Sequence, residues 1–145
     1  MNEAVVTVRA ATADDAERLA TMLADEGYVA GPSDLAARIE RYGAIGSSVL
    51  VAEASDEVVG FISLLILPRF EVDELFGRIT ALVVDPGVRE RGVGRLLMEA
   101  AERAAAEAGT SFLEVTAGHH RPDARHLFES MGYDAGVAAY LRKRV

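Results

Sequence analysis

The chain has 145 residues, half of them hydrophobic, and one domain spanning residues 1–145 is expected from this length. Its 15 Lys and Arg against 23 Asp and Glu give a net charge of −8. This charge disfavours binding to nucleic acid or to an anionic membrane surface and makes a cationic small molecule the better electrostatic match. The absence of cysteine excludes disulfides, thiolate metal sites and a cysteine nucleophile.

The N-terminal third predicts a strand followed by two helices. Residues 5–10 are typical of a strand, and Thr12 with Asp15 three positions later resembles a capping box at the start of the first helix. A second helix is predicted after Pro32, with Ser33 as its cap, an inward face that includes Leu35, Ile39 and Tyr42, and Gly43 as its end.

The middle of the chain changes to the pattern of extended strands. Residues 49–53 and 58–67 are two such runs, joined by a hairpin turn at residues 55–57. Residues 69–77 are acidic and without a clear period, which indicates a loop, and residues 79–84 predict another strand.

The C-terminal part predicts a helix from Val93, a strand at residues 112–116, a helix around residues 124–131 and a last strand at residues 137–141. The whole order indicates an α+β fold with mixed α/β layers, in which helices flank a mostly antiparallel central sheet. The N-terminus lacks the apolar stretch of a signal peptide, and no apolar run could span a bilayer, so a cytoplasmic protein is expected.

The loop after the strand that ends at Val84 is suited to binding phosphate. No Ser, Thr, Asp or Asn stands at the entry of the following helix, so its first N–H groups lack a side-chain cap and form an anion site at the positive end of the helix dipole. Gly92 and Gly94 lack Cβ atoms and would let a phosphate approach the backbone. The arginines that could add charge-assisted hydrogen bonds are Arg89, Arg91 and Arg95.

These residues carry a family resemblance. The pattern Arg89-x-x-Gly92-x-Gly94, placed after a Val-Val-Asp-Pro strand end, resembles the acetyl-coenzyme A loop of the GNAT superfamily of N-acetyltransferases. Residues 124–133 resemble the second signature of that family, a helix that ends in Gly-aromatic, and residues 8–16 resemble its opening strand and helix. The likeness covers essentially the whole chain.

The resemblance implies where acetyl-coenzyme A lies and how it reacts. The coenzyme would lie between the strands at 79–84 and 112–116, and an amine would attack its thioester directly, with no covalent enzyme intermediate. No metal is expected, because His119 and His120 are adjacent and no well-spaced third ligand accompanies them. The implied cofactor-binding residues are Leu82, Val83, Val84, Arg89, Arg91, Gly92, Val93, Gly94 and Arg95.

The catalytic residues stay open. The family's frequent Tyr on the second-signature helix is Phe128 here, and its frequent Glu on the fourth strand is Thr80. Candidate general bases are Glu71, Asp73, Glu74, His119 and His120, and the candidate acid is Tyr140. The three acidic residues either border the entrance for a protonated amine or form a solvated surface loop.

Two functions from different classes remain possible at this point. One is an N-acetyltransferase that acts on a primary amine of a small molecule or peptide, and the other is a non-catalytic acyl-coenzyme A-binding sensor or scaffold module. A homodimer that pairs or packs the strands at residues 137–141 is expected, while the basic residues Arg142, Lys143 and Arg144 would favour a monomer.

Overall fold

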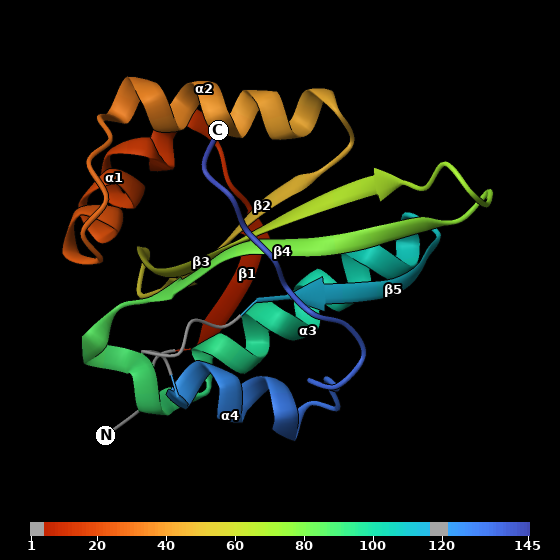
Figure 1. Cartoon of the computed structure of the whole chain (residues 1–145). Helices are drawn as coiled ribbons and strands as arrows, with labels where there is room; N and C mark the ends of the chain where they lie inside the picture. The colour runs from red at the N-terminus through yellow and green to blue at the C-terminus, as the bar shows by residue number, and fades with distance from the viewer. Residues whose placement is uncertain (1–4, 117–121) are drawn as a thin grey trace.

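The fold is a five-stranded sheet covered by helices on both faces, in a computed structural model that describes residues 5–116 and 122–145 (Figure 1). The strands lie in sequence order, as β1 (Val6–Ala10), β2 (Ser48–Ala54), β3 (Glu57–Pro68), β4 (Leu75–Val84) and β5 (Thr110–Val115). The first four pair antiparallel, and β5 pairs parallel to β4. The predicted α+β fold with a mostly antiparallel sheet is confirmed.

The helices form one layer on each side of the sheet. The first layer holds α1 (Ala16–Asp25) and α2 (Pro32–Ala44), and the second holds α3 (Val93–Glu107) and α4 (Pro122–Ser130). Short 3₁₀ helices, η1 (Ala13–Asp15) and η2 (Pro86–Arg91), precede α1 and α3. None of the described helices is long and apolar enough to cross a membrane.

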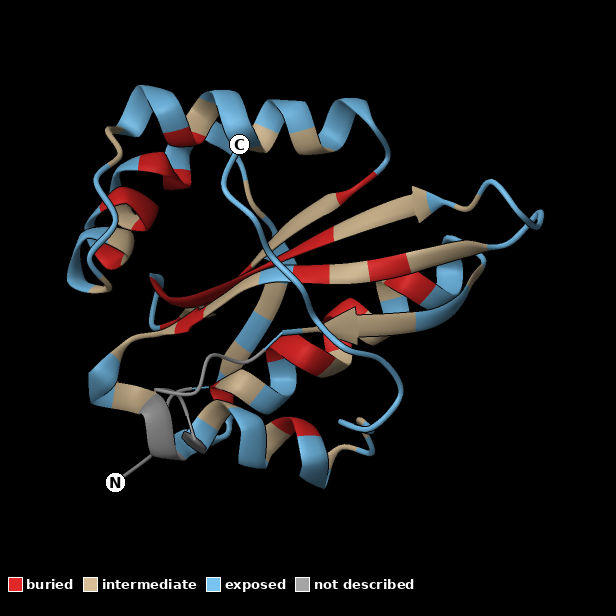
Figure 2. Cartoon of the chain, viewed as in Figure 1, coloured by how far each residue is buried: buried red, intermediate tan, exposed pale blue. Residues whose placement is uncertain are grey.

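Two hydrophobic cores result because strand side chains alternate between the faces. Val51, Phe61 and Val83 pack in the core beneath α1 and α2, whereas Ala52 and Ile62 pack in the core beneath α3 and α4. Figure 2 shows the buried positions concentrated along β2, β3 and the sheet-facing sides of the helices. The central strand β3 is therefore covered on both faces.

The hairpin between β2 and β3 confirms the predicted turn. Ser55 and Asp56 both have positive φ angles, of 52° and 62°. Two consecutive residues of this kind match the twist of the flanking strands in a two-residue hairpin. The predicted loop before β4 is shorter than expected, because β4 already begins at Leu75 and pairs there with Pro68.

The predicted cap of the second helix is wrong. Gly31 is the N-cap residue of α2, Pro32 is its first residue, and the Asp34 carboxylate accepts a hydrogen bond of 2.9 Å from the Gly31 N–H. Proline is favoured at the first helical position, because its fixed φ suits the helix and an N–H there would have no partner within the helix. The helix therefore begins before Ser33. The helix also continues through Gly43 to its end at Ala44.

The predicted last strand is also wrong. Residues 137–141 form neither strand nor helix, and their apolar side chains are exposed, with Val137 at 76% and Leu141 at 89%. Strand propensity depends on packing against a neighbouring strand, and this segment has no such partner. It crosses in front of the sheet toward α2 (Figure 1). The homodimer expected to pair or pack these segments stays a prediction.

The entry to α1 carries a stability prediction. Asp15 is 7% exposed and accepts from both terminal nitrogens of Arg9 at 2.9 Å and from the Thr12 N–H at 2.8 Å, as the capping-box interpretation expects. The Arg9 hydrogen bonds hold the pKa of Asp15 below its ordinary value, against the opposite effect of burial.

We expect Asp15→Asn to lower the free energy of unfolding at neutral pH by about 1–3 kcal/mol, since charge-assisted hydrogen bonds are lost. Arg9 keeps 41% of its side-chain surface exposed, so no buried charge is left behind. Because the folded-state pKa is depressed, this stabilisation is present above the unfolded pKa of about 3.9 and is lost as the pH falls through the folded value. Urea unfolding at a series of pH values should show the difference in free energy of unfolding between wild type and Asp15→Asn shrinking in acid.

Glu129→Gln, in the exposed pair with Arg125, is the control. An Asp15→Asn difference that stays constant with pH would contradict this account.

Candidate active site

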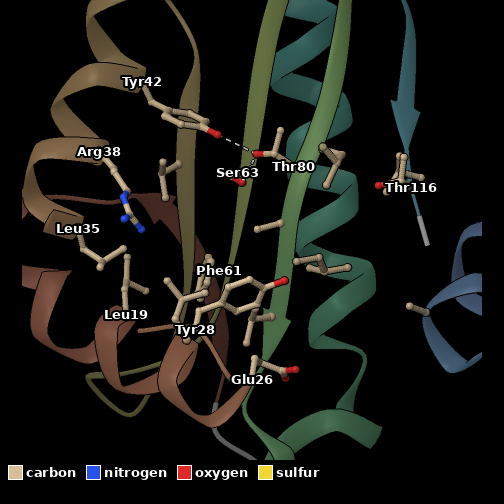
Figure 3. Close-up of a pocket in the computed structure, with 18 of the residues that line it drawn as sticks. Leu19, Glu26, Tyr28, Leu35, Arg38, Tyr42, Phe61, Ser63, Thr80 and Thr116 are labelled. Carbon is tan, nitrogen blue, oxygen red and sulfur yellow. Dashed lines mark hydrogen bonds between the residues drawn. The ribbon is translucent and has the colours of Figure 1, made fainter. Parts of the chain in front are cut away.

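A cleft of about 620 Å³ lies between the layer of α1 and α2 and the sheet. Its apolar wall includes Leu19, Leu35 and Phe61 (Figure 3). From there it follows β4 past Thr80 and reaches the end of β5 at Thr116 and the side of α4 that faces the sheet. The cleft thus connects the first helical layer with the place where β4 and β5 meet.

A β-bulge in β4 sets the geometry of the cleft. Ser63 of β3 lies opposite Ala81, but the next residue, Leu64, lies opposite Ile79, so Thr80 is an extra residue without a register partner. Ile79 packs in the core beneath α3, whereas Ala81 packs against the core beneath α1 and α2. A regular strand would place both on the same face. The bulge therefore turns Thr80 toward the cleft, consistent with the frequent position of bulges beside functional sites.

The same bulge coincides with the end of pairing between β4 and β5. The last paired residues are Ile79 and Val115, immediately before the bulge, while β4 continues to Val84. β5 itself ends at Val115, so β4 continues beyond the bulge to Val84 without a described β5 partner. Leu82 and Val83 line the cleft here, at the place where the family resemblance implies the arm of the coenzyme.

Three hydroxyl groups meet at the bulge. Thr80 Oγ1 shares a hydrogen bond of 2.8 Å with the Tyr42 hydroxyl of α2 and one of 2.6 Å with the Ser63 hydroxyl of β3 (Figure 3). A threonine hydroxyl offers one donor and two acceptor positions. Two of these three positions are used, so Thr80 has one left for a molecule in the cleft.

The charged groups that line the cleft are Arg38 of α2, Arg142 of the C-terminal segment, and Glu26 at the end of α1. Arg142 donates a hydrogen bond of 3.0 Å to the Tyr140 hydroxyl, which lowers the pKa of that phenol. Tyr140 itself is 61% exposed and does not line the cleft.

The entry of α3 has the features predicted for an anion site. Gly92 is the N-cap residue with φ of 76°, and the helix start has no side-chain cap among the described groups. A Cβ atom built on Gly92 would meet nothing within 4 Å, so the space around it is open. Gly94 has a different role, because a Cβ there would lie 3.2 Å from the Leu127 side chain of α4. That glycine permits α3 and α4 to pack closely.

The other residues predicted at this loop differ in what they offer. Val93 is fully buried, so only its backbone could reach a ligand. Arg95 donates a hydrogen bond of 3.0 Å to Ser130, Arg91 is exposed, and the side chain of Arg89 lies outside the described part of the structure. Asp85 directly follows β4 and accepts a hydrogen bond of 2.8 Å from the Gly87 N–H, as expected for a residue that caps a turn.

The acidic loop between β3 and β4 is not part of the cleft. Glu71 is exposed and forms an ion pair of 3.1 Å with Arg69, which also lies 3.7 Å from Glu74. Its own backbone N–H and Arg69 hold the pKa of Glu71 below the ordinary value, the wrong direction for a general base. Neither these two residues nor Asp73 line the cleft. This position favours the solvated surface loop over a border of the acceptor entrance, which stays a prediction. His119 and His120 lie outside the described residues.

Sequence reasoning named Thr80 only as the position of the family's frequent Glu, and it missed Ser63 and Arg38. A signal for Arg38 was present, because it falls on the helix stripe of Leu35, Ile39 and Tyr42 that was predicted to point inward. No sequence signal marked the bulge at Thr80. Within the described ranges, no group of three or more His, Asp or Glu side chains could hold a metal ion.

Comparison with known proteins gives a consistent result. The model of the acetyltransferase (GNAT) family matches residues 16–133. The uncharacterized N-acetyltransferase YhfO of Bacillus subtilis (strain 168) is 33% identical over 110 residues, which are 73% of this chain and 70% of YhfO.

Two solved structures share the fold. A transcriptional regulator from Bacillus halodurans C-125 has a TM-score of 0.82 and 23% identity over 97% of this chain and all of that one. A ribosomal-protein-alanine N-acetyltransferase from Brucella melitensis biovar Abortus 2308 has a TM-score of 0.82 and 20% identity over the same shares. With the family model covering most of its length, this chain belongs to the GNAT family of acetyltransferases.

Proposed function

We propose that the protein transfers the acetyl group of acetyl-coenzyme A to a primary amine of a small molecule or peptide, by direct attack in a ternary complex. The observation that carries this proposal is the continuity of one cleft from the place where the pairing of β4 and β5 ends to the hydroxyl groups at the Thr80 bulge. Two substrates could thereby meet without a covalent enzyme intermediate.

The residues at the α3 entry suit the diphosphate of the coenzyme. The open space at Gly92 and the absence of a side-chain cap leave the first N–H groups of α3 directed at an anion. Arg91 is placed to add positive charge near this entry. The bound coenzyme supplies an activated thioester, and the backbone of Leu82 and Val83 would align its arm along the cleft.

The amine would be oriented by Thr80. Its one remaining hydrogen-bonding position can hold the amine nitrogen, while Tyr42 and Ser63 fix the direction of the Thr80 hydroxyl. A neutral hydroxyl is not a strong base, so the chain of hydroxyls would guide the amine proton toward water. Phe128 is buried in the core beneath α3 and offers no proton, and departure of the thiolate relies on its own stability as a leaving group.

The alternative is a non-catalytic acyl-coenzyme A-binding module. It is favoured by the same Phe128 and by the absence of a carboxylate from the three hydrogen-bonded hydroxyls at Thr80. The two functions share the coenzyme site and differ only in whether an amine is acetylated.

Release of free thiol from acetyl-coenzyme A across a panel of primary amines separates these functions. We expect release that depends on the amine, with the acetylated amine identified by mass spectrometry. Binding of acetyl-coenzyme A without release for any amine would support the sensor instead, and absence of binding would contradict both functions.

A further inference from the structure

Arg38 occupies an unusual position on the cleft wall. On α2 it shares one stripe with Leu35, Ile39 and Tyr42, the spacing of a helix face that packs inward. Figure 3 shows its guanidinium pointing into the cleft, between Tyr42 and Leu35. A cation on this face approaches whatever occupies the cleft.

No described residue forms a hydrogen bond or ion pair with Arg38. The nearest acid along the helix, Asp34, instead accepts from the Gly31 N–H at the start of α2. Other arginines form ion pairs with carboxylates: Arg18 pairs with Asp85 at 2.6 Å, and Arg78 pairs with Glu114 at 2.8 Å. Arg38 thus keeps its planar set of N–H donors for a ligand, a geometry that matches carboxylate or phosphate oxygens.

The local charge of the cleft is opposite to that of the chain. Two cations, Arg38 and Arg142, and one carboxylate, Glu26, line it, so the formal charge of its described wall is 2 − 1 = +1. The whole chain carries −8. The cationic acceptor expected from overall charge is therefore the poorer match for this wall, and an anionic group is the better one.

The spacing fits a single small molecule. Arg38 lies four residues before Tyr42 on α2, which corresponds to about 6 Å along the helix axis. Tyr42 in turn is hydrogen bonded to Thr80, where the amine is proposed to bind. Leu35 and Phe61 offer apolar contact to the body of the same molecule.

We propose, on the basis of the acetyl transfer argued above, that the acceptor is an amine that also carries a carboxylate or phosphate group, and that Arg38 binds this anionic group. Arg38 determines which acceptor binds, and Thr80 orients the amine that reacts.

Matched amines with and without the anion test this proposal. Leucine and leucinamide differ in a carboxylate, and O-phosphoethanolamine and ethanolamine differ in a phosphate. We expect kcat/KM to be about 10- to 100-fold higher for the anionic member of at least one pair. Each kcat/KM is corrected for the fraction of the amine that is unprotonated at the assay pH. The pair that shows the larger ratio identifies carboxylate or phosphate as the recognised group.

Variants of α2 assign the effect to Arg38. Arg38→Ala should abolish the preference for the anionic amine by raising the KM of that amine. Arg38→Lys should keep part of the preference. Arg41→Ala is the matched control, because Arg41 is on the same helix but does not line the cleft. An unchanged preference in Arg38→Ala, or its loss in Arg41→Ala, would overturn the proposal.

The failure of this inference is distinct from failure of the acetyl transfer. Thiol release with equal kcat/KM for anionic and neutral amines would leave the transfer standing and would refute the role of Arg38. If no amine causes release, calorimetric binding of leucine and leucinamide to the protein with coenzyme A replaces the kinetic measurement. Tighter binding of leucine, or of O-phosphoethanolamine over ethanolamine in the same assay, that is lost in Arg38→Ala would then support the anion site. Equal binding within both pairs would refute it.

Discussion

Replacing Thr80 with valine is expected to lower kcat/KM for amine acetylation by about 100-fold, the usual scale for loss of one well-placed polar group at a reacting centre. Valine keeps the β-branched shape and fills the bulge, but it removes the hydroxyl that Tyr42 and Ser63 hold in place. Acetyl-coenzyme A should bind this variant as it binds the wild type, because the α3 entry is untouched.

Two further variants control this measurement. Thr80→Ser retains the hydroxyl and should recover most of the activity, whereas Tyr42→Phe removes one of the two partners of Thr80 and should cause a smaller loss of about 3- to 10-fold. A Thr80→Val protein with full activity and an unchanged unfolding temperature would remove Thr80 from the mechanism.

The affinity of the Gly92→Asp variant for acetyl-coenzyme A is expected to be at least about tenfold lower than that of the Gly92→Asn variant. Only the Asp variant places a carboxylate where the phosphates are proposed to lie. Asn and Asp have the same shape and are the non-glycine residues that best tolerate a positive φ such as the 76° found here. A side chain at this position meets nothing within 4 Å, so neither variant should disturb the packing.

Comparing the two variants separates charge from bulk. The difference in affinity should shrink at high salt, since an exposed charge is screened there. Equal calorimetric affinities for Gly92→Asp and Gly92→Asn would place the phosphates elsewhere. Gly94 is less suitable for this test, because its close contact with Leu127 would mix binding with stability.

The sequence predicted the regular elements well, where their periodic patterns agree with the packing. The helix stripe that includes Leu97 and Ala101 does face a buried core, and the turn at Ser55 and Asp56 does close a hairpin. The strand predicted at residues 137–141 failed, since its apolar residues have no neighbouring strand to pair with.

The candidate site was predictable only in part. The lack of a side-chain cap at the start of α3, at Gly92, follows from local residue types, so the sequence could predict it. The bulge at Thr80 depends on the register between β3 and β4, which no local pattern specifies. The contact of Tyr42 with Thr80 joins residues 38 positions apart, and only the packing of α2 over the sheet brings them together.

The bulge at Thr80 has two consequences for the candidate site. It turns the Thr80 hydroxyl into the cleft, and it coincides with the end of the pairing between Ile79 and Val115. The places proposed for the coenzyme arm and for the amine are therefore adjacent in β4. A substitution that removed the bulge would disturb both.

A crystal structure of the protein with coenzyme A bound tests this central claim most directly. We predict the diphosphate at the entry of α3 beside Gly92, the arm of the coenzyme along Leu82 and Val83, and its sulfur atom facing Thr80. Coenzyme A bound away from the C-terminal ends of β4 and β5, with its sulfur remote from Thr80, would contradict the proposed site.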